Sequence, residues 1–511
     1  MSWTTISPDL SRNDKTKQQS TPEPLTPDNS SAEYYDTLSA VAESPIQKDL
    51  IWVGTDDGLV HLTRDAGKNW TNVTPKQMLE WTRVNLIEPS PYDRATAYLA
   101  ADLHFSDDFR PMIFKTTDLG KTWTQITNGI PAKDYVHSVH VDPKRKGLLY
   151  AGTELGIYVS FDDGANWQSL QLNLPHAPIY DTAVHGNDLV VATHGRSFWV
   201  LDNITPLRQV SASMASQPVH LFTPAIAYRE REPGGFGGGG VRKNVGQNPP
   251  VGAVVDYYLS AVPSEPLTLD ISDSTGRVVR HISSETRGTQ PGARGRNAPA
   301  ARTAVASLSA RAGMNRFVWN YRVDGPTMVP GMVILELQNG GGPLVPPGTY
   351  QLKLTVAGKE YTAPLEVKAD PRVKTSQGDF EKQYEFAIKV RDRVTEVHNT
   401  VNQIRESRSV LEIIRKRANP TTVQAIEATE KRMSEIEGQL IQVESVNRWA
   451  ALVYPIMLDA QYADVGNVVE SADTAPPAQT YEVFQVYEQR REEQLARWKS
   501  LEPEIAQLKS Q

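Results

Sequence analysis

Four acidic side chains stand at predicted turns, where they could take part in acid–base chemistry. Asp56, Asp102 and Glu154 each follow a short apolar strand, and Asp181 lies at the start of another. Two carboxyl groups about 5 to 10 Å apart can hydrolyse a glycosidic bond, one as the acid and the other as base or nucleophile. Because a sequence carries no distances, it leaves open which two of the four would act together.

The same turns carry rings, cations and a further acid, a mixture that could bind a sugar or a polypeptide. Such groups are also common on any solvated rim, so they mark a candidate binding surface and not a reaction. Its predicted members are Asp57, His104, Arg110, Tyr135, Tyr180, His194 and Arg196.

The amino-acid composition gives little reason to expect a metal site or a cofactor. The chain has no cysteine, and its 10 histidines show no spacing typical of metal ligands. Neighbouring acids such as Asp56 and Asp57 could bind calcium, although no EF-hand loop is present. We therefore predict no metal site and no cofactor, and calcium is the alternative left open.

A repeated turn positions these groups. The pattern [Ser/Thr]-x-Asp-x-Gly-x-x-Trp begins at Thr63, Thr116 and Ser160. In a tight turn the hydroxyl and the carboxylate can bond backbone N–H groups, glycine supplies a positive φ, and the indole ring is buried against the turn. We therefore predict a structural role for the repeated residues, which are Asp65, Gly67, Trp70, Asp118, Gly120, Trp123, Asp162, Gly164 and Trp167.

Short strands surround each turn at a spacing of about one four-stranded propeller blade. Each repeat runs through strand A, strand B, a tight turn, strand C, the Asp-containing turn and strand D. Strand B is apolar in every copy, and a fourth copy, LVVATHGR (189–196), has no such turn after it. Residues 1–208 are therefore predicted to be blades of a β-propeller, and the fold class is mainly β.

Strand order also predicts which face would carry the chemistry. In an up-and-down blade, the A–B and C–D turns lie on one face, and the B–C turns and D–A connections lie on the other. The repeated turns join strands C and D, whereas the candidate carboxylates and rim residues lie in B–C turns and D–A connections. A binding or catalytic site is therefore expected on the face opposite the repeated turns.

The repeated turn is identified as the Asp box, or bacterial neuraminidase repeat. Runs such as GTDDGLVHLTRDAGKNW (54–70) and AGTELGIYVSFDDGANW (151–167) resemble bacterial sortilin-like propeller proteins that are often labelled glycosyl hydrolases. The resemblance implies a propeller followed by a β-sandwich and a helical tail, in an exported protein. Sialidases of this fold bind substrate with three arginines, and Arg83, Arg110 and Arg196 stand on suitable loops, but no motif connects them.

The predicted propeller is incomplete. Residues 2–8 (SWTTISP) match strand D of a blade, as in NWTNVTP (69–75), but have no Asp box before them. Two interpretations remain open. The chain is the C-terminal portion of a longer propeller protein, or this strand completes the fourth blade and closes the ring.

Two further regions follow the blades. Residues 209–252 are predicted to be a linker with a glycine-rich loop at 234–240, and 253–370 an immunoglobulin-like β-sandwich with a mobile insertion at 284–308. Apolar residues at steps of three and four predict a helical bundle or hairpin over 376–511, whose stripe is either a core or a face for self-association. That stripe comprises Ala387, Val390, Val394, Val397, Val401, Ile404, Leu411, Met433, Ile436, Leu440, Val443, Leu495, Trp498, Leu501, Ile505 and Leu508.

Charge and hydropathy narrow the function. A net charge of −7 argues against a nucleic-acid partner, and no run is apolar enough to span a membrane. No signal peptide is recognisable, so the compartment rests on the resemblance alone. The preferred function is binding of a polypeptide or a glycan on the face opposite the Asp boxes. A glycoside hydrolase of sialidase or xyloglucanase type and a structural assembly subunit are the alternatives.

Overall fold

The computed structural model describes residues 3–19, 35–231, 246, 248–285, 307–332, 334, 337, 341–444 and 452–510. They fall into two compact units, Met1–Ala215 and Ser216–Gln511. The glycine-rich run at 234–240, most of the insertion predicted at 284–308 and residues 20–34 lie outside the described residues.

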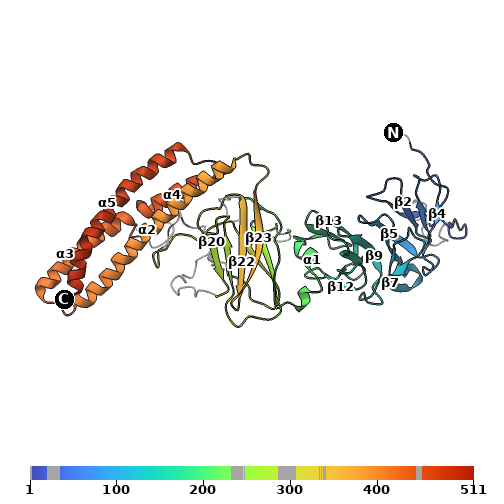
Figure 1. Ribbon diagram of the computed structural model, residues 1–511, viewed down its shortest axis with the longest axis horizontal. Helices are drawn as coiled ribbons and strands as arrows, with labels where there is room; N and C mark the ends of the chain where they lie inside the picture. The colour runs from blue at the N-terminus through green and yellow to red at the C-terminus, as the bar shows by residue number, and fades with distance from the viewer. Residues whose placement is uncertain are drawn as a thin grey trace, which may run out of the picture. The chain divides into compact units, whose positions relative to one another are not determined.

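The first unit consists of four antiparallel sheets in which strands that are consecutive in the chain are also neighbours in the sheet. Three sheets have four strands and the last has three, as the missing fourth box predicts. Figure 1 shows the sheets following one another along the chain. The strands are β1 (Leu38–Glu43), β2 (Ile51–Thr55), β3 (Val60–Thr63) and β4 (Thr71–Asn72); β5 (Arg83–Pro89), β6 (Ala97–Leu103), β7 (Asp108–Thr116) and β8 (Thr124–Gln125); β9 (Val136–Val141), β10 (Leu149–Thr153), β11 (Ile157–Ser160) and β12 (Gln168–Ser169); and β13 (Ile179–His185), β14 (Asp188–Thr193) and β15 (Phe198–Leu201).

The sheets pack face to face, so both faces of the second strand are buried in the first three blades, whereas the residues of β14 alternate between buried and partly exposed. Every residue of β6 is buried, and so is every residue of β10. Three apolar clusters fill the junctions between successive sheets. Strands buried on both faces read as continuous apolar runs, which is why the second strand of each repeat shows no alternation of polar and apolar residues.

Each Asp box is closed by the bonds that its residue types predict. In the first box, Thr63 Oγ1 donates to Asp65 at 2.8 Å and accepts the Gly67 N–H at 2.9 Å, while the Asn69 N–H donates to Asp65 at 2.9 Å. The boxes at Thr116 and Ser160 repeat these bonds. The bonds from Asn69 and Thr63 lower the pKa of Asp65 to about 2, so the carboxylate stays charged and the turn stays closed.

The box tryptophans fasten each blade to the one before it. The Trp123 indole donates to the Val73 carbonyl at 2.7 Å, and the Trp167 indole donates to the Ile126 carbonyl at 2.7 Å. The box glycine allows this close approach, since a Cβ on Gly120 would lie 2.7 Å from Val73. The Asp box is therefore both a hairpin turn and a joint between blades.

The N-terminal segment occupies the place of a strand D that precedes the first blade. The Trp70 indole donates to the Ile6 carbonyl at 3.0 Å, as the later tryptophans do to Val73 and Ile126. Among the described residues none forms a strand D in the fourth sheet; the chain continues from β15 into the short helix α1 (Thr205–Gln209). There Arg208 forms an ion pair of 2.9 Å with the buried Asp142 of the third blade.

Two sheets form a β-sandwich in the second unit. One has the order β16–β18–β21 and the other β17–β23–β22–β19–β20, and a single apolar cluster fills the space between them. Gly276 and Gly358 lie in the turns of two hairpins, both with positive φ. The strands are β16 (Val219–Leu221), β17 (Ala227–Arg229), β18 (Ala253–Leu259), β19 (Thr268–Ser272), β20 (Val278–Ser283), β21 (Gly313–Trp319), β22 (Gly348–Val356) and β23 (Lys359–Ala369).

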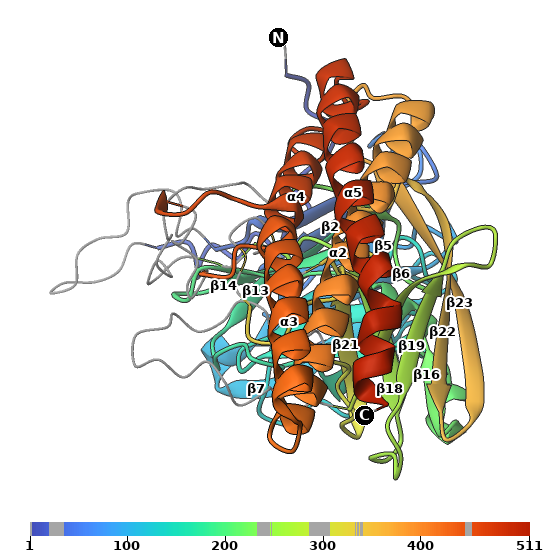
Figure 2. The ribbon, with the colours of Figure 1, turned by 90° about the vertical axis from the view of Figure 1, so that its left-hand side faces the viewer.

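Among the described residues of the second unit there are four α-helices: α2 (Gln377–Arg415), α3 (Pro420–Leu440), α4 (Leu458–Val469) and α5 (Ala478–Lys509). Figure 2 shows them lying side by side. The predicted stripe forms their internal core, with two exceptions. Val443 is half exposed because α3 ends at Leu440, and Leu495 is only partly buried beside the buried Gln494.

A buried ion pair joins the sandwich to the helices. Arg229, the last residue of β17, is 2% exposed and lies 2.5 Å from Asp473, which precedes α5. Arg231 bonds the same carboxylate at 2.7 Å, and Gln383 of α2 donates to the Val469 carbonyl at 2.8 Å. Arg322 adds an ion pair of 2.9 Å with Glu470, so several polar contacts join the sandwich to the helices. None of the described helices combines the length and the apolar composition that crossing a bilayer demands.

Candidate functional site

The first strand of every blade begins with a β-bulge. The register between strands A and B slips by one residue at the same place in all four sheets. The extra residue is Ser39, Asn85, His137 or Tyr180 in blades one to four. A bulge leaves one residue out of the ladder and re-aims its side chain, and bulges are frequent beside functional sites. The propeller thus offers four equivalent side chains on one face.

A second set of equivalent positions lies opposite the bulges, directly after strand B. In three blades its backbone N–H donates to the residue before strand A: Asp56 to Thr37 at 3.1 Å, Glu154 to Tyr135 at 3.0 Å and His194 to Pro178 at 2.8 Å. In the second blade Asp102 pairs in register with Arg83. Three of the four predicted catalytic acids therefore occupy the same position in successive blades.

In three blades the bulge side chain contacts the side chain after strand B. Asn85 Nδ2 lies 2.6 Å from Asp102 Oδ2, and His137 Nε2 lies 2.9 Å from Glu154 Oε2. In the fourth blade the rings of Tyr180 and His194 are stacked, with centroids 4.9 Å apart and planes at 8°. Each of these blades thus contributes one side-chain pair to the face opposite the Asp boxes.

Aromatic contacts connect these pairs into one surface. His104 stacks on Tyr135 at 4.6 Å, Tyr135 meets His137 at 5.1 Å, and His137 meets Tyr180 at 4.5 Å. We call these three rings together with Tyr180 and His194 the ring row; it spans three blades. At one end Phe105 packs on His104 at 4.0 Å and is 74% exposed, and Phe109 lies 6.1 Å from Tyr135. Within the row Tyr180 is half exposed whereas Tyr135 is only 9% exposed, so Tyr180, together with Phe105 at the end of the row, offers a ligand its open ring faces.

The carboxylates beside the ring row differ in accessibility. Asp102 is 1% exposed and accepts bonds from Asn85 and from the N–H and ring of His104. Glu154 is one-third exposed, so its carboxylate faces both solvent and the row. Burial and the neighbouring Glu154 raise the pKa of Tyr135, which therefore stays a neutral phenol. Asp56 bonds the Thr37 backbone and hydroxyl at 2.7 and 2.9 Å.

The fourth predicted acid, Asp181, takes part in a different cluster. His140 of β9 lies 2.7 Å from Asp181 of β13 and 3.4 Å from Glu88 of β5. Burial disfavours the charged imidazole, but the bonds to Asp181 and Glu88 outweigh it and raise the pKa of His140 to about 9. One imidazolium therefore joins three blades beneath the ring row.

Three other predicted rim residues stand apart from the ring row. Asp57 is fully buried and accepts the Arg12 N–H at 2.6 Å, so it anchors the N-terminal segment. Arg110 forms a fork with Asp108 of its own strand and is largely exposed. Arg196 lies in the turn before β15, where its backbone carbonyl accepts the Trp199 indole.

Sequence reasoning missed Asn85, His137 and the two exposed phenylalanines as site residues. A signal for the first two was present, since each stands two residues after the start of its repeat, in RVN (83–85) and YVH (135–137). When the four repeats are aligned at the start of strand A, Asn85 and His137 occupy the same position as Ser39 and Tyr180. The bulge that turns this column outward depends on hydrogen-bond register, which a single sequence does not show.

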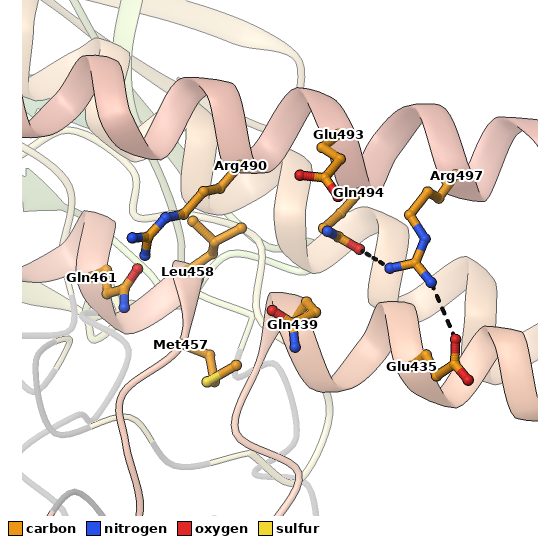
Figure 3. Close-up of a pocket in the computed structure, with 9 residues that line it drawn as sticks. All are labelled: Glu435, Gln439, Met457, Leu458, Gln461, Arg490, Glu493, Gln494 and Arg497. Atoms are coloured by element: carbon orange, nitrogen blue, oxygen red, sulfur yellow. Dashed lines mark hydrogen bonds and ion pairs between the residues drawn. The ribbon is translucent and has the colours of Figure 1, made fainter.

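A separate cavity of about 530 Å³ lies between α3, α4 and α5. In Figure 3, Arg497 bridges Glu435 and Gln494, at 3.2 and 3.0 Å, and Arg490 lies on the same side beside Gln461. Two arginines and two glutamates line the cavity, so its wall carries no net charge and favours neither anionic nor cationic ligands. Among the described residues, no cluster of acids and imidazoles is arranged to hold a metal ion.

Comparisons with known proteins agree with the blade assignment. Residues 58–200 match the family model described as sortilin, neurotensin receptor 3. A xyloglucanase of Paenibacillus sp is 28% identical over 159 residues, which cover 28% of this chain and 16% of that protein. The chain therefore spans less than a fifth of this curated relative.

Solved structures of low similarity also match. The GH74 xyloglucanase of Xanthomonas campestris is 20% identical, covering 34% of this chain and 27% of its own, with a TM-score of 0.26. YCF48 of Cyanidioschyzon merolae is 18% identical, covering 33% and 53%, with a TM-score of 0.26. The bonded Asp boxes and the match over residues 58–200 together support a β-propeller of the Asp-box type for the blades of this chain.

Proposed function

We propose that the face opposite the Asp boxes binds a glycan chain along the ring row. The observation that carries this proposal is the unbroken series of ring contacts from His104 to His194. The rings hold one another in place, so little side-chain freedom is lost when a ligand binds. The exposed ring of Tyr180 offers the apolar face of a sugar a flat partner.

Polar groups beside the rings support a glycan over a polypeptide. Glu154, His137 and Asn85 present an acceptor, an imidazole and an amide at the row, a set that can bond sugar hydroxyls. An extended peptide is often held by the free edge of a sheet. The row lies at the β-bulges of the first strands, which are edge strands of their sheets, and a bulge blunts an edge against pairing with another strand. The xyloglucanase relative is consistent with a carbohydrate ligand.

Binding of xyloglucan oligosaccharides to the full chain, measured by titration calorimetry, tests this proposal. Tyr180→Ala should weaken binding at least tenfold, which is about 1.4 kcal/mol, because it removes the half-exposed ring that lies between His137 and His194 in the row. Tyr228→Ala is the matched control, since Tyr228 is 45% exposed on the sandwich and lies outside the propeller unit. A screen of arrayed glycans follows if xyloglucan does not bind.

Two results would overturn the glycan proposal. One is an affinity that Tyr180→Ala and Phe105→Ala both leave unchanged, which would place the ligand elsewhere. The other is a screen in which peptides bind in a Tyr180-dependent way and glycans do not, which would favour a polypeptide ligand.

Glycoside hydrolysis is the second candidate, because Asp102 and Glu154 hold equivalent positions on adjacent blades. Glu154 is the more accessible carboxylate and would protonate the leaving oxygen as the acid. His104, held in place by Asp102, would act as the base that takes a proton from the attacking water. Turnover of aryl glycosides that Glu154→Gln abolishes, with glycan binding retained, would support this mechanism. Turnover unchanged in Glu154→Gln would exclude it.

We propose accessory roles for the second unit. The two-sheet sandwich is of immunoglobulin-like type, and with the helices it serves as a docking module for the propeller. A truncated chain that ends near residue 215 should then bind the glycan with the affinity of the full chain. A loss of binding there would assign the second unit a direct part in the site.

A further inference from the structure

One histidine connects the three strands that carry the β-bulges of blades two to four. His140 belongs to β9, and its two partners belong to the neighbouring blades, Glu88 to β5 and Asp181 to β13. The bulges at the beginnings of the same three strands supply side chains to the ring row and its edge. The spacing of these strands therefore sets the spacing of the side chains above them.

Both ring nitrogens of His140 face a carboxylate. Nε2 lies 2.7 Å from Asp181 Oδ1, and Nδ1 lies 3.4 Å from Glu88 Oε2. Because an ionised carboxylate only accepts hydrogen bonds, the two contacts are favourable together only when both nitrogens carry a proton. In a neutral ring, the lone pair of one nitrogen faces a carboxylate, and that contact is lost. The cluster therefore joins β5, β9 and β13 fully only while the imidazole is charged.

The groups around His140 decide where its charge is lost. Charged groups face it from two strands, Glu88 from β5 and Asp181 from β13. On β10 its partner in register is the buried Tyr150, and burial raises the pKa of that phenol, so it stays neutral. Burial also disfavours the charged imidazole, but the bonds to Asp181 and Glu88 raise the pKa of His140 to about 9. The imidazolium is therefore present at pH 7 and is lost as the pH rises through about 9.

Tyr180 is the ring of the row that depends most directly on this cluster. It is the bulged residue of β13, so it has no partner in the ladder that would hold it in place. Its neighbour Asp181 bonds His140 of β9, and its own ring meets that of His137, also on β9, at 4.5 Å. Losing the charged bond lets β13 move away from β9, which separates the two rings and opens the row at its half-exposed member.

We propose that His140 positions the ring row and that its protonation controls the affinity of the row for a glycan. This inference rests on the proposed function and adds the regulation of the same site. At neutral pH the imidazolium holds the three strands together and the rings form an unbroken platform. At alkaline pH the neutral ring releases one carboxylate, the row loosens at Tyr180, and the glycan binds more weakly. His140 acts through Asp181 and Tyr180, so it is a positioning residue.

Titration calorimetry of the full chain with xyloglucan oligosaccharides, from pH 7 to pH 10, tests the proposal. Wild-type affinity should fall by about tenfold over this range, a coupling typical of two linked sites. His140→Gln should bind at pH 7 as weakly as wild type does at pH 10. His140→Arg keeps its charge throughout, so its affinity should change far less. His185→Gln, which alters an exposed histidine of β13, is the control and should follow wild type.

The variants separate the imidazole from other ionisable groups. The remaining residues of the row are identical in all these chains, so the difference between wild type and His140→Arg isolates His140. Asp181→Asn removes one partner of the imidazole and leaves the imidazole itself in place, so the midpoint of the pH profile should move below 9. A wild-type affinity that is the same at pH 7 and pH 10, or a midpoint that Asp181→Asn leaves unmoved, would overturn the proposal.

A measurement without ligand keeps this inference apart from the proposed function. Nuclear Overhauser contacts between the rings of His137 and Tyr180 should be present in wild type at pH 7 and weaken by pH 10, and His140→Gln should lack them at both pH values. If no glycan binds at pH 7, the proposed function fails, and the ring contacts still decide whether His140 positions the row. Contacts that persist at pH 10 in wild type and in His140→Gln would overturn that role.

Discussion

The imidazolium of His140 should stabilise the propeller only while it is protonated. It is hydrogen-bonded to Asp181 on one side and faces Glu88 on the other, so it joins three blades. These bonds raise the pKa of His140 to about 9, from an ordinary value of 6.5. A raised pKa means that the contribution is fully present below pH 6.5 and is lost as the pH rises from there through 9.

The size of the effect follows from the pKa. A tenfold change in proton affinity is worth about 1.4 kcal/mol, so a rise from 6.5 to about 9 corresponds to about 3 kcal/mol. His140 is one-fifth exposed, but Asp181 is more than half exposed, and solvent screens that contact. We therefore expect about 2 kcal/mol.

Unfolding in urea, followed by tryptophan fluorescence, measures this contribution because most of the tryptophans lie in the blades. His140→Gln should lower the free energy of unfolding by about 2 kcal/mol at pH 6, and the difference from wild type should vanish near pH 10. His185→Gln is the control, since His185 is an exposed histidine of β13. A difference that persists at pH 10, or an imidazole that titrates near 6.5 by NMR, would refute the reasoning.

Two further predictions concern the joints of the fold. Trp123→Ala should lower the free energy of unfolding of the blades by about 3 to 5 kcal/mol. Trp70→Ala should lower it by less, because Trp123 is 7% exposed whereas Trp70 is only half-buried. Equal losses for the two variants in urea unfolding would contradict the proposed role of the tryptophans at the blade junctions. Arg229→Ala should lower the free energy of unfolding of the second unit by about 3 kcal/mol, measured by thermal unfolding of residues 216–511. The reason is that Asp473 stays buried with Arg231 as its remaining ion-pair partner. An unchanged free energy of unfolding would show that the Arg229–Asp473 ion pair does not stabilise the unit.

Local chemistry made much of the fold predictable. The Asp box closes through side chains within eight residues of one another, so its bonds follow from residue type and spacing. The helical stripe was predictable for the same reason, because its period is set by the helix itself. Val443 was predicted in the core and lies beyond the end of α3, because nothing in the stripe marks where a helix stops.

The candidate site was predicted only in part. The residues after strand B could be chosen because they follow an apolar run, and Asp102, Glu154 and His194 do lie beside the ring row. Asp57, one residue further along than Asp56, is buried under Arg12 instead. Side chains alternate between opposite environments along a strand or turn, so a step of one residue decides between a rim and a core position.

By itself, the sequence determined the blades, their boxes and the face on which chemistry could occur, because these depend on contacts between near neighbours in the chain. Only the tertiary structure decided which side chains meet. The ring row combines residues from three blades, and His140 finds its partners on β5 and β13, about fifty and forty residues away. Such contacts depend on the bulge register and on how each sheet packs on the next, and neither leaves a periodic signal in the sequence.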